Sequence, residues 1–204
     1  MADVGDVQSM DPHSLNETLQ LSFTQNIYDP LVSRGKDMSL KPGLATKWTQ
    51  TSPTVWRFEL RKGVTFHDGT PFTADDVVFS LELLRDHGRP LHHQYYSKVA
   101  KTEVLDPLTV RFDFGGVADR ELPMILGLMP ILPRHATDVS RFEETTLAPP
   151  IGSGPYRVTA VKPGTSVTFD TAPAALAHLD SVAALRPEPM GLTEAGFARF
   201  RLHL

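Results

Sequence analysis

Apolar residues recur at every fourth position near the start of the chain. The members of this stripe are Leu15, Leu19, Phe23 and Ile27, which fall on one face of a helix. Ser14 or Asn16 can cap the start of such a helix, and Pro30 disfavours helical geometry at the residue before it. The pattern therefore predicts a helix that ends near Tyr28.

Strict alternation of apolar and polar residues follows in TVWRFEL, which is typical of a half-buried strand. Its apolar side comprises Trp56, Phe58 and Leu60. Val64 and Phe66 continue the alternation as far as the turn dipeptide Asp68-Gly69. We therefore expect extended chain up to this turn.

A second helix is predicted directly after the turn. Thr73 is a good N-cap, Asp76 is its reciprocal partner, and Asp75 adds negative charge to the first turn. The apolar stripe of this helix comprises Val77, Leu81 and Leu84. Gly88 is expected to close the helix at its C-terminal end. Every residue from 68 to 88 thus has a structural role, so this stretch is interpreted as scaffold.

Two hairpins are predicted further along the chain. Asp106-Pro107 turns the first, in TEVLDPLTVRFDF, and Pro163-Gly164 turns the second, in YRVTAVKPGTSVTFD. Prolines interrupt the apolar run ELPMILGLMPILP between them, which indicates a short helix or an irregular buried segment. Strands thus both precede and follow helices, so we expect a mixed α/β (α+β) fold without regular βαβ winding.

The residues from 171 to 204 differ from the rest of the chain. Alanine is frequent there, and TAPAALAHLDSVAALRPEPMG has no clear period. The final stretch MGLTEAGFARFRLHL is compatible with a helix. We expect this tail to be poorly packed.

Composition excludes several classes of function. The chain has 204 residues, of which 41% are hydrophobic and 22% charged, as in ordinary globular proteins. The formal net charge of −4, with both signs interspersed, argues against nucleic acid as a partner. Cysteine is absent, which excludes disulfides, thiolate catalysis and cysteine-ligated zinc. No apolar run reaches the length of a membrane-spanning helix, and the start of the chain has no export-signal pattern.

The histidines give little support for a metal site. His92 and His93 are adjacent, so their side chains diverge on a strand or on a helix alike. Together with His87 they fall in a predicted loop, and a loop-borne metal site stays open as an alternative. His67-Asp68 invites a catalytic or metal-site interpretation, but no further His-Asp motif with metal-site spacing follows it. We expect neither a metal nor a cofactor.

The stretch IGSGPY contains two glycines around Ser153 but matches no catalytic motif. A nucleophile elbow needs Gly-x-Ser-x-Gly, and a dinucleotide-binding loop needs a third glycine where Arg157 stands. Gly152 and Gly154 instead permit a sharp turn with exposed backbone amides, which suits a carbonyl or carboxylate. No pair of carboxylates stands out as an acid/base couple, so we expect no enzyme and assign no catalytic residue.

Several landmarks together resemble one family. The stretches DPHSLNETLQLSFTQNIYDPLV, LKPGLATKW, WRFELRKGVTFHDGTPFTADDVVFSLE, VLDPLTVRF and IGSGPYRV follow the order found in the extracytoplasmic peptide- and nickel-binding proteins of ABC importers, solute-binding protein family 5. RELPMILGLMPILPRH resembles the branch linked to oligopeptide and microcin-type uptake. The resemblance spans roughly residues 5 to 170.

The resemblance implies a fold of two lobes that close on a ligand, with an extra subdomain in the first lobe. Residues 1–50 and 150–204 would form the main part of this lobe, and residues 51–149 the extra subdomain. The family is periplasmic or otherwise extracytoplasmic, whereas no signal peptide is recognised in this sequence. The second lobe of the family has no counterpart in the sequence either, so the chain is interpreted as truncated.

The resemblance also implies a ligand-binding face on the first lobe. The implied ligand-binding residues are Asn16, Glu17, Thr18, His92, His93, Tyr95, Gly152, Ser153 and Gly154. Glu17 could meet an ammonium group, Tyr95 offers a flat apolar face, and helix and turn amides can receive carbonyl oxygens. These groups suit a peptide.

Two classes of function follow. In the first, the chain is the substrate-binding component of an ABC importer for di- and oligopeptides and acts with permease subunits. Without a second lobe it would bind a peptide or other small solute weakly or not at all. In the second, it is a free-standing interaction or structural module whose uncovered cleft face favours self-association. A metal-binding protein built on the histidine loop is a distant third.

Overall fold

The computed structural model describes residues 9–11, 24, 26–35, 37–116, 121–144, 146–172 and 199–203. Its helices are α2 (Ala74–His87), α3 (Pro90–Tyr96) and α4 (Leu122–Gly127), with a short 3-10 helix, η1 (Val139–Arg141). Its strands are β1 (Val32–Arg34), β2 (Leu40–Pro42), β3 (Ala45–Ser52), β4 (Val55–Leu60), β5 (Lys101–Asp106), β6 (Thr109–Asp113), β7 (Tyr156–Lys162), β8 (Ser166–Thr171) and β9 (Arg199–His203). The mixed α/β fold expected from the sequence is confirmed.

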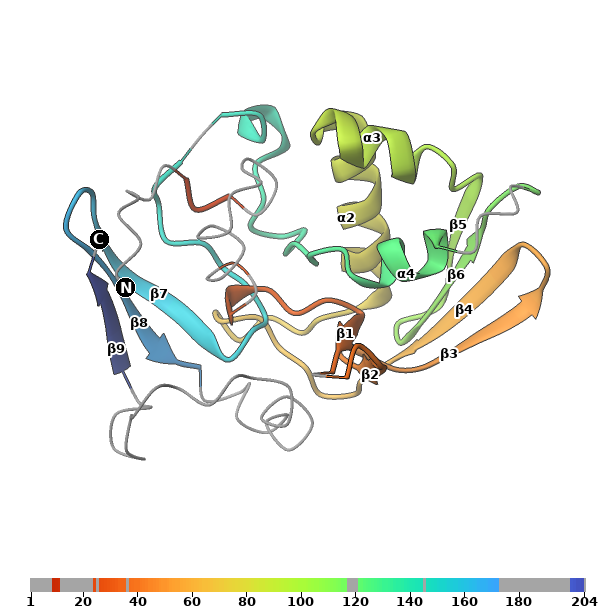
Figure 1. Ribbon diagram of the computed structural model, residues 1–204, viewed down its shortest axis with the longest axis horizontal. Helices are drawn as coiled ribbons and strands as arrows, with labels where there is room; N and C mark the ends of the chain where they lie inside the picture. The colour runs from red at the N-terminus through yellow and green to blue at the C-terminus, as the bar shows by residue number, and fades with distance from the viewer. Residues whose placement is uncertain are drawn as a thin grey trace.

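Two antiparallel sheets lie at opposite ends of the long axis, with α2 between them (Figure 1). The larger sheet has the strand order β3-β4-β6-β5, and the smaller has the order β7-β8-β9. A third, two-stranded sheet joins β1 to β2. Helix α2 packs against β5 and β6, and α3 packs against α2. The larger sheet and its helices therefore form a continuous unit within residues 45–113.

The alternation in TVWRFEL produces a strand with one largely buried face, and Val55 at its start is buried on the other side. Phe58 and Leu60 on β4 are buried and Trp56 is half-buried, as predicted. Phe58 meets Phe112 of β6 edge to face, with ring centroids 5.6 Å apart and an interplanar angle of 78°. Such a contact adds to the stabilisation from burying both rings, which belong to the hydrophobic core.

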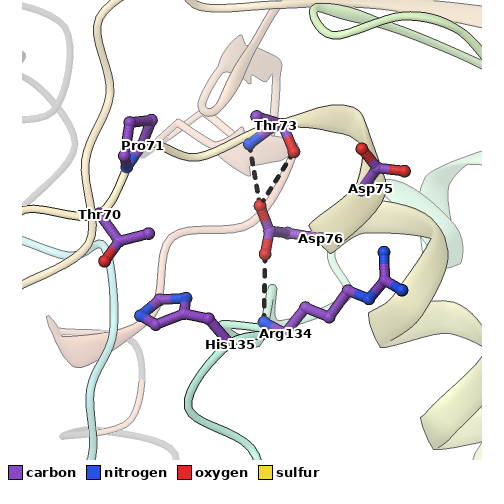
Figure 2. A pocket seen from close by; sticks show the side chains of 7 residues that line it. All are labelled: Thr70, Pro71, Thr73, Asp75, Asp76, Arg134 and His135. Atoms are coloured by element: carbon purple, nitrogen blue, oxygen red, sulfur yellow. Dashed lines mark hydrogen bonds between the residues drawn. The ribbon is translucent and has the colours of Figure 1, made fainter.

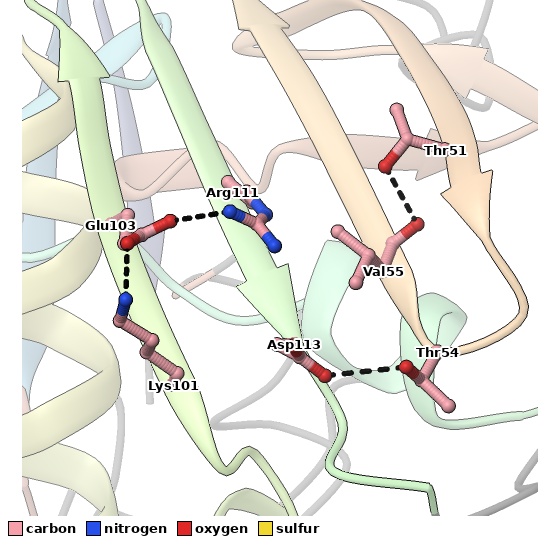
Figure 3. A network of polar contacts seen from close by, with 7 residues as sticks. All are labelled: Thr51, Thr54, Val55, Lys101, Glu103, Arg111 and Asp113. Carbon is pink, nitrogen blue, oxygen red and sulfur yellow. Dashed lines mark hydrogen bonds and ion pairs between the residues drawn. The ribbon is translucent and has the colours of Figure 1, made fainter.

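The outer face of the larger sheet carries a network of charges. Glu103 on β5 pairs with Lys101 on the same strand, and its other oxygen receives a bond of 2.8 Å from Arg111 on β6 (Figure 3). The bond from Lys101 and the charge of both cations hold the pKa of Glu103 below its ordinary value. At the end of β6, Asp113 accepts a bond from Thr54. This face is polar because the inner face provides the core.

Helix α2 begins and ends where the sequence predicts. Thr73 is the N-cap, and its N–H donates to the Asp76 carboxylate at 2.9 Å. At the other end Gly88 has a φ of −76°, so it ends the helix in an extended rather than a left-handed conformation. Glycine is still needed there because a Cβ would lie 2.2 Å from the carbonyl oxygen of Leu84.

Both predicted hairpins are confirmed. β5 pairs with β6 across Asp106-Pro107, and β7 pairs with β8 across Pro163-Gly164. Gly164 has the positive φ, 65°, that its place in the turn requires. The proline-interrupted apolar run forms α4 and then an irregular segment in which Met129, Ile131 and Leu132 are buried.

The ends of the chain are described only in part. The predicted first helix is seen at residues 24, 26 and 27 and ends before Tyr28, as expected, while its earlier residues lie outside the described ones. The helix considered for the final stretch is wrong at residues 199–203, which form β9 and pair antiparallel with β8. The expectation of poor packing falls mainly on residues 173–198, outside the described part of the chain.

Among the described residues, none of the helices has both the length and the apolar character needed to cross a membrane.

Candidate ligand-binding site

The turn formed by residues 152–154 is buried against the end of the first helix. A Cβ on Gly152 would lie 2.0 Å from the carbonyl oxygen of Ile27, and one on Gly154 would lie 2.7 Å from the same oxygen. The N–H of Gly154 donates to that oxygen at 2.7 Å. Ser153 is buried between the two glycines, and its hydroxyl accepts from the N–H of Asp29 at 3.4 Å. Both glycines are therefore needed for this close approach of two backbones.

His67 holds the same turn from the other side. Its backbone N–H donates to the carbonyl of Gly152 at 2.8 Å. Its ring accepts the N–H of Gly152 at Nδ1, 3.2 Å away, and lies 2.8 Å from the carbonyl oxygen of Gly154 at Nε2. Burial lowers the pKa of His67 below its ordinary value. The half-buried ring is thus a structural bridge between the extended chain before α2 and the turn before β7.

The expectation that residues 152–154 expose free amides is wrong for both glycines. The N–H of Gly152 is taken by His67, and the N–H of Gly154 is taken by Ile27. A carbonyl or carboxylate of a ligand therefore finds neither donor available in this structure. Contact of Gly152, Ser153 or Gly154 with a ligand stays a prediction, and it does not rest on these two amides.

His67 and Asp68 face different partners. The Asp68 carboxylate lies 2.6 Å from Nε2 of His135, and both side chains are about one-third exposed. Hydrogen bonds from His135 and Thr70 hold the pKa of Asp68 below its ordinary value, against the opposing effect of desolvation. The two residues do not converge on one point, so the interpretation of this stretch as scaffold agrees with its contacts.

The histidine pair lies on a helix rather than in the predicted loop. Pro90 occupies the first turn of α3, where its missing N–H leaves no bond unmade. Nδ1 of His92 accepts from the N–H of Arg89 at 3.3 Å, and the ring stacks on Tyr96 with centroids 5.7 Å apart. The His93 ring bonds instead to the carbonyl of Arg85 at 3.0 Å. The two rings diverge, as the sequence spacing requires.

Tyr95 is the aromatic candidate on α3. Its ring is half-buried, and the ammonium of Lys98 lies 5.1 Å from the ring centroid. Part of the ring is therefore already covered by a cation of the same chain. In Figure 1, α3 and β7 lie apart, so the residues of α3 and those of the turn before β7 do not form one compact cluster. Asn16, Glu17 and Thr18 lie outside the described residues.

An open pocket at the start of α2 was not predicted. It has a volume of about 350 Å³ and is lined by Thr70, Pro71, Thr73, Asp75, Asp76, Arg134 and His135. Figure 2 shows Asp76 at its inner wall, bonded to Thr73 and to the backbone N–H of Arg134 at 3.1 Å. The sequence places Asp76 and Arg134 far apart, and no local pattern indicates that they meet.

Asp76 also fixes the segment after α4. The Asp76 carboxylate accepts the N–H of Arg134. One turn further along α2, the hydroxyl of Ser80 accepts the N–H of Leu132 at 2.8 Å. Asp76 and Ser80 lie one turn apart, so together they bind two backbone donors of residues 132–134. Asp76 in the first turn of α2 thus both caps the helix and binds the segment that follows α4.

Replacing Asp76 by asparagine is expected to lower the free energy of unfolding by about 2 kcal/mol. Asparagine keeps the size of the side chain, but its amide nitrogen would face an N–H donor in place of one carboxylate oxygen. Urea denaturation followed by circular dichroism measures the change. Asp75→Asn is the matched control, because it removes the same charge from the exposed neighbour and should cost no more than about 0.5 kcal/mol. Equal losses for the two variants would contradict this account.

No group of three or more histidine, aspartate or glutamate side chains is placed to hold a metal ion among the residues that the structure describes.

Comparison with known sequences identifies relatives. The family described as bacterial extracellular solute-binding proteins, family 5 Middle, matches residues 39–182. Protein BMEII0691 of Brucella melitensis, a binding protein by name, is 39% identical over 155 residues, which are 74% of this chain and 25% of that protein. The peptidoglycan-binding protein YepA of Agrobacterium fabrum is 37% identical over 156 residues, with the same two shares. The chain thus spans about a quarter of the length of these curated relatives.

Solved structures share the fold. NikA from Brucella suis, in complex with Fe(III)-EDTA, matches with a TM-score of 0.76 and 21% identity over 99% of this chain and 38% of NikA. AppA from Bacillus subtilis, in complex with a nonapeptide, matches with a TM-score of 0.73 and 22% identity over 86% and 36%. DppA from Helicobacter pylori, in complex with the peptide STSA, matches with a TM-score of 0.69 and 28% identity over 83% and 38%.

These comparisons confirm the resemblance seen in the sequence. The solved structures are two-lobed periplasmic binding proteins, and the described fold corresponds to part of a lobe. The family match covers most of the chain, including β3 to β8 and the helices α2, α3 and α4. The chain therefore belongs to family 5 of the bacterial extracellular solute-binding proteins.

Proposed function

We propose that this chain is part of the substrate-binding component of an ABC importer that takes up peptides, and that it binds its substrate without chemical change. It would act outside the cytoplasmic membrane and deliver peptide to the permease subunits of the importer. The observation that carries the proposal is the 28% identity to DppA of Helicobacter pylori, a structure that contains a bound peptide. The name of YepA, a peptidoglycan-binding protein at 37% identity, supports the same class of ligand.

In this proposal the chain builds the first lobe. Residues 1–50 and 150–204 form its main part, which is supported by the packing of Ile27 and Asp29 against the turn at residues 152–154. Residues 51–149 form the extra subdomain, supported by the continuous sheet and its helices. The pairing of β3 with β4 from Ala45 onwards moves the proposed start of this subdomain from residue 51 to Ala45, so that residues 1–44 stay in the main part.

The proposed contacts with peptide come from one side of the ligand. Tyr95 would pack its uncovered ring surface against apolar groups of the peptide, and His93 would present an exposed imidazole beside it. Asn16, Glu17 and Thr18 complete the proposed face, together with the turn at residues 152–154. Contacts confined to one side enclose little of a ligand, so we expect low affinity from the chain by itself.

An amide NMR titration tests the proposal because it detects weak binding. A millimolar oligopeptide long enough to reach both segments is expected to shift the signals of α3 and of residues 150–155, whereas an oligosaccharide of similar length should shift neither. Tyr95→Ala should abolish the shifts on α3, and Tyr95→Phe should retain them because the flat ring is kept. Absence of peptide-dependent shifts, or shifts confined to other elements, would refute the proposed site.

A further inference from the structure

His67 joins two segments that lie 85 residues apart in the chain. On one side is the extended chain that leads into α2, and on the other is the buried turn that leads into β7. Three hydrogen bonds cross between them, one from the backbone of His67 and two at its ring. The same turn holds the backbone of Ile27 through Gly154, so three segments meet at this point.

The two ring bonds require a single protonation state. The N–H of Gly152 is a donor, so Nδ1 of His67 must offer a lone pair. The carbonyl of Gly154 is an acceptor, so Nε2 must carry the proton and donate it. Only the neutral imidazole with its proton on Nε2 satisfies both partners. A doubly protonated ring would present N–H to the N–H of Gly152, and that bond would have to open.

We propose that His67 is an acid-sensitive latch, a positioning residue that holds the turn at residues 152–154 against the subdomain and releases it on protonation. The latch goes beyond peptide binding, because it requires no ligand. Opening the bond from the N–H of Gly152 to Nδ1 of His67 frees a backbone donor in the turn that also holds Ile27. Protonation of one ring therefore loosens the junction of all three segments.

The charges around the ring favour the neutral form on balance. Burial is the main cause of the lowered pKa of His67, and the positive charge of Arg157 at the start of β7 lowers it further. Asp68 opposes this effect from the neighbouring position, but its carboxylate is directed to His135. Among the described residues, Arg157 and Asp68 are the charged groups that act on this ring.

The direction of the pH effect follows from this lowered pKa. In the unfolded chain the pKa of His67 lies near its ordinary value of 6.5, whereas in the folded chain this pKa is lower. The stabilisation is therefore complete above pH 6.5 and is lost as the pH falls from there towards the pKa of the folded state.

Long-range nitrogen–proton NMR spectra of the native chain test the latch directly. At neutral pH we expect the His67 ring to show the Nε2–H tautomer, with an Nε2 proton that exchanges slowly with water. On acidification, its protonation should coincide with shifts of the amide signals of Gly152 and Gly154. A ring that is protonated on Nδ1, or that titrates without moving those two signals, would overturn the proposal.

A substitution separates the latch from simple packing. His67→Gln offers an acceptor and a donor at a spacing similar to that of the ring nitrogens, but it cannot titrate. We expect it to remain folded at neutral pH and to lose the part of the pH dependence of stability that lies below pH 6.5. His93→Gln, on the exposed side of α3, is the control and should keep that dependence. If the pH profile of His67→Gln equals that of the native chain, the latch is wrong, and the NMR test stands even if this variant fails to fold.

Discussion

Replacing Gly152 by alanine is expected to lower the free energy of unfolding by about 3 kcal/mol or more. The added Cβ would lie 2.0 Å from the carbonyl oxygen of Ile27, which is a backbone atom within the core and cannot rotate away. To relieve the overlap, the turn must separate from Ile27, which opens the bonds made by Gly154 and His67. Urea denaturation followed by tryptophan fluorescence measures the loss.

A matched glycine shows whether steric overlap is the cause. Gly63 has a φ of +80° and no neighbouring atom within 4 Å of an added Cβ. Gly63→Ala should therefore cost only about 1 kcal/mol, the strain of a left-handed backbone. If both alanine variants lose the same stability, close approach to Ile27 is not what requires Gly152.

Replacing Phe112 by alanine is expected to cost about 3–5 kcal/mol of unfolding free energy. Phe112 is fully buried on β6, and its ring packs edge to face against Phe58 on the adjacent strand β4. Its removal leaves a cavity between the sheet and α2 and deprives Phe58 of its partner. Thermal unfolding followed by circular dichroism reports the change as a lower Tm.

Leu105→Ala serves as the comparison for this core substitution. Leu105 lies on β5 of the same sheet, and the residue is 50% exposed. Its truncation should change the stability by no more than about 0.5 kcal/mol. A loss at Leu105 as large as that at Phe112 would show that burial does not determine the effect.

The elements that the sequence predicts are those whose signals are local. The cap at Thr73, the stripe that follows it and the turns at Asp106-Pro107 and Pro163-Gly164 each depend on residues within one turn or one hairpin. These patterns act before any distant contact forms. The scaffold interpretation of the stretch after Asp68 was accessible for the same reason.

The pairing of distant segments was not accessible from the sequence. No pattern near His67 shows that its ring meets Gly152 and Gly154, and none near Asp76 shows that it meets Arg134. The sequence predicts free amides at Gly152 and Gly154, because the sequence of a glycine turn is the same whether its backbone N–H groups face solvent or protein acceptors. The backbone of Ile27 decides between these cases, and it belongs to another part of the chain.

Two misread segments did contain a local signal. Pro90 before a run without glycine is typical of the first turn of a helix, and α3 begins there. In RFRLH, polar and apolar residues alternate, which is the pattern of a strand and agrees with β9. Short segments allow more than one interpretation, and here contacts with distant elements decide: α3 packs against α2, and β9 pairs with β8.

Because residues 26–29 pack against the turn at residues 152–154, the chain between these two segments starts and ends at neighbouring points. Everything from β1 to α4 and η1 is then a loop in the topological sense, closed at its base. Such a loop can gain or lose sequence during evolution while the body that carries it keeps its geometry. His67 limits that freedom, because it lies within this loop and its ring bonds to the turn at residues 152–154 where the loop closes. A loop of altered sequence must still place an imidazole against that turn.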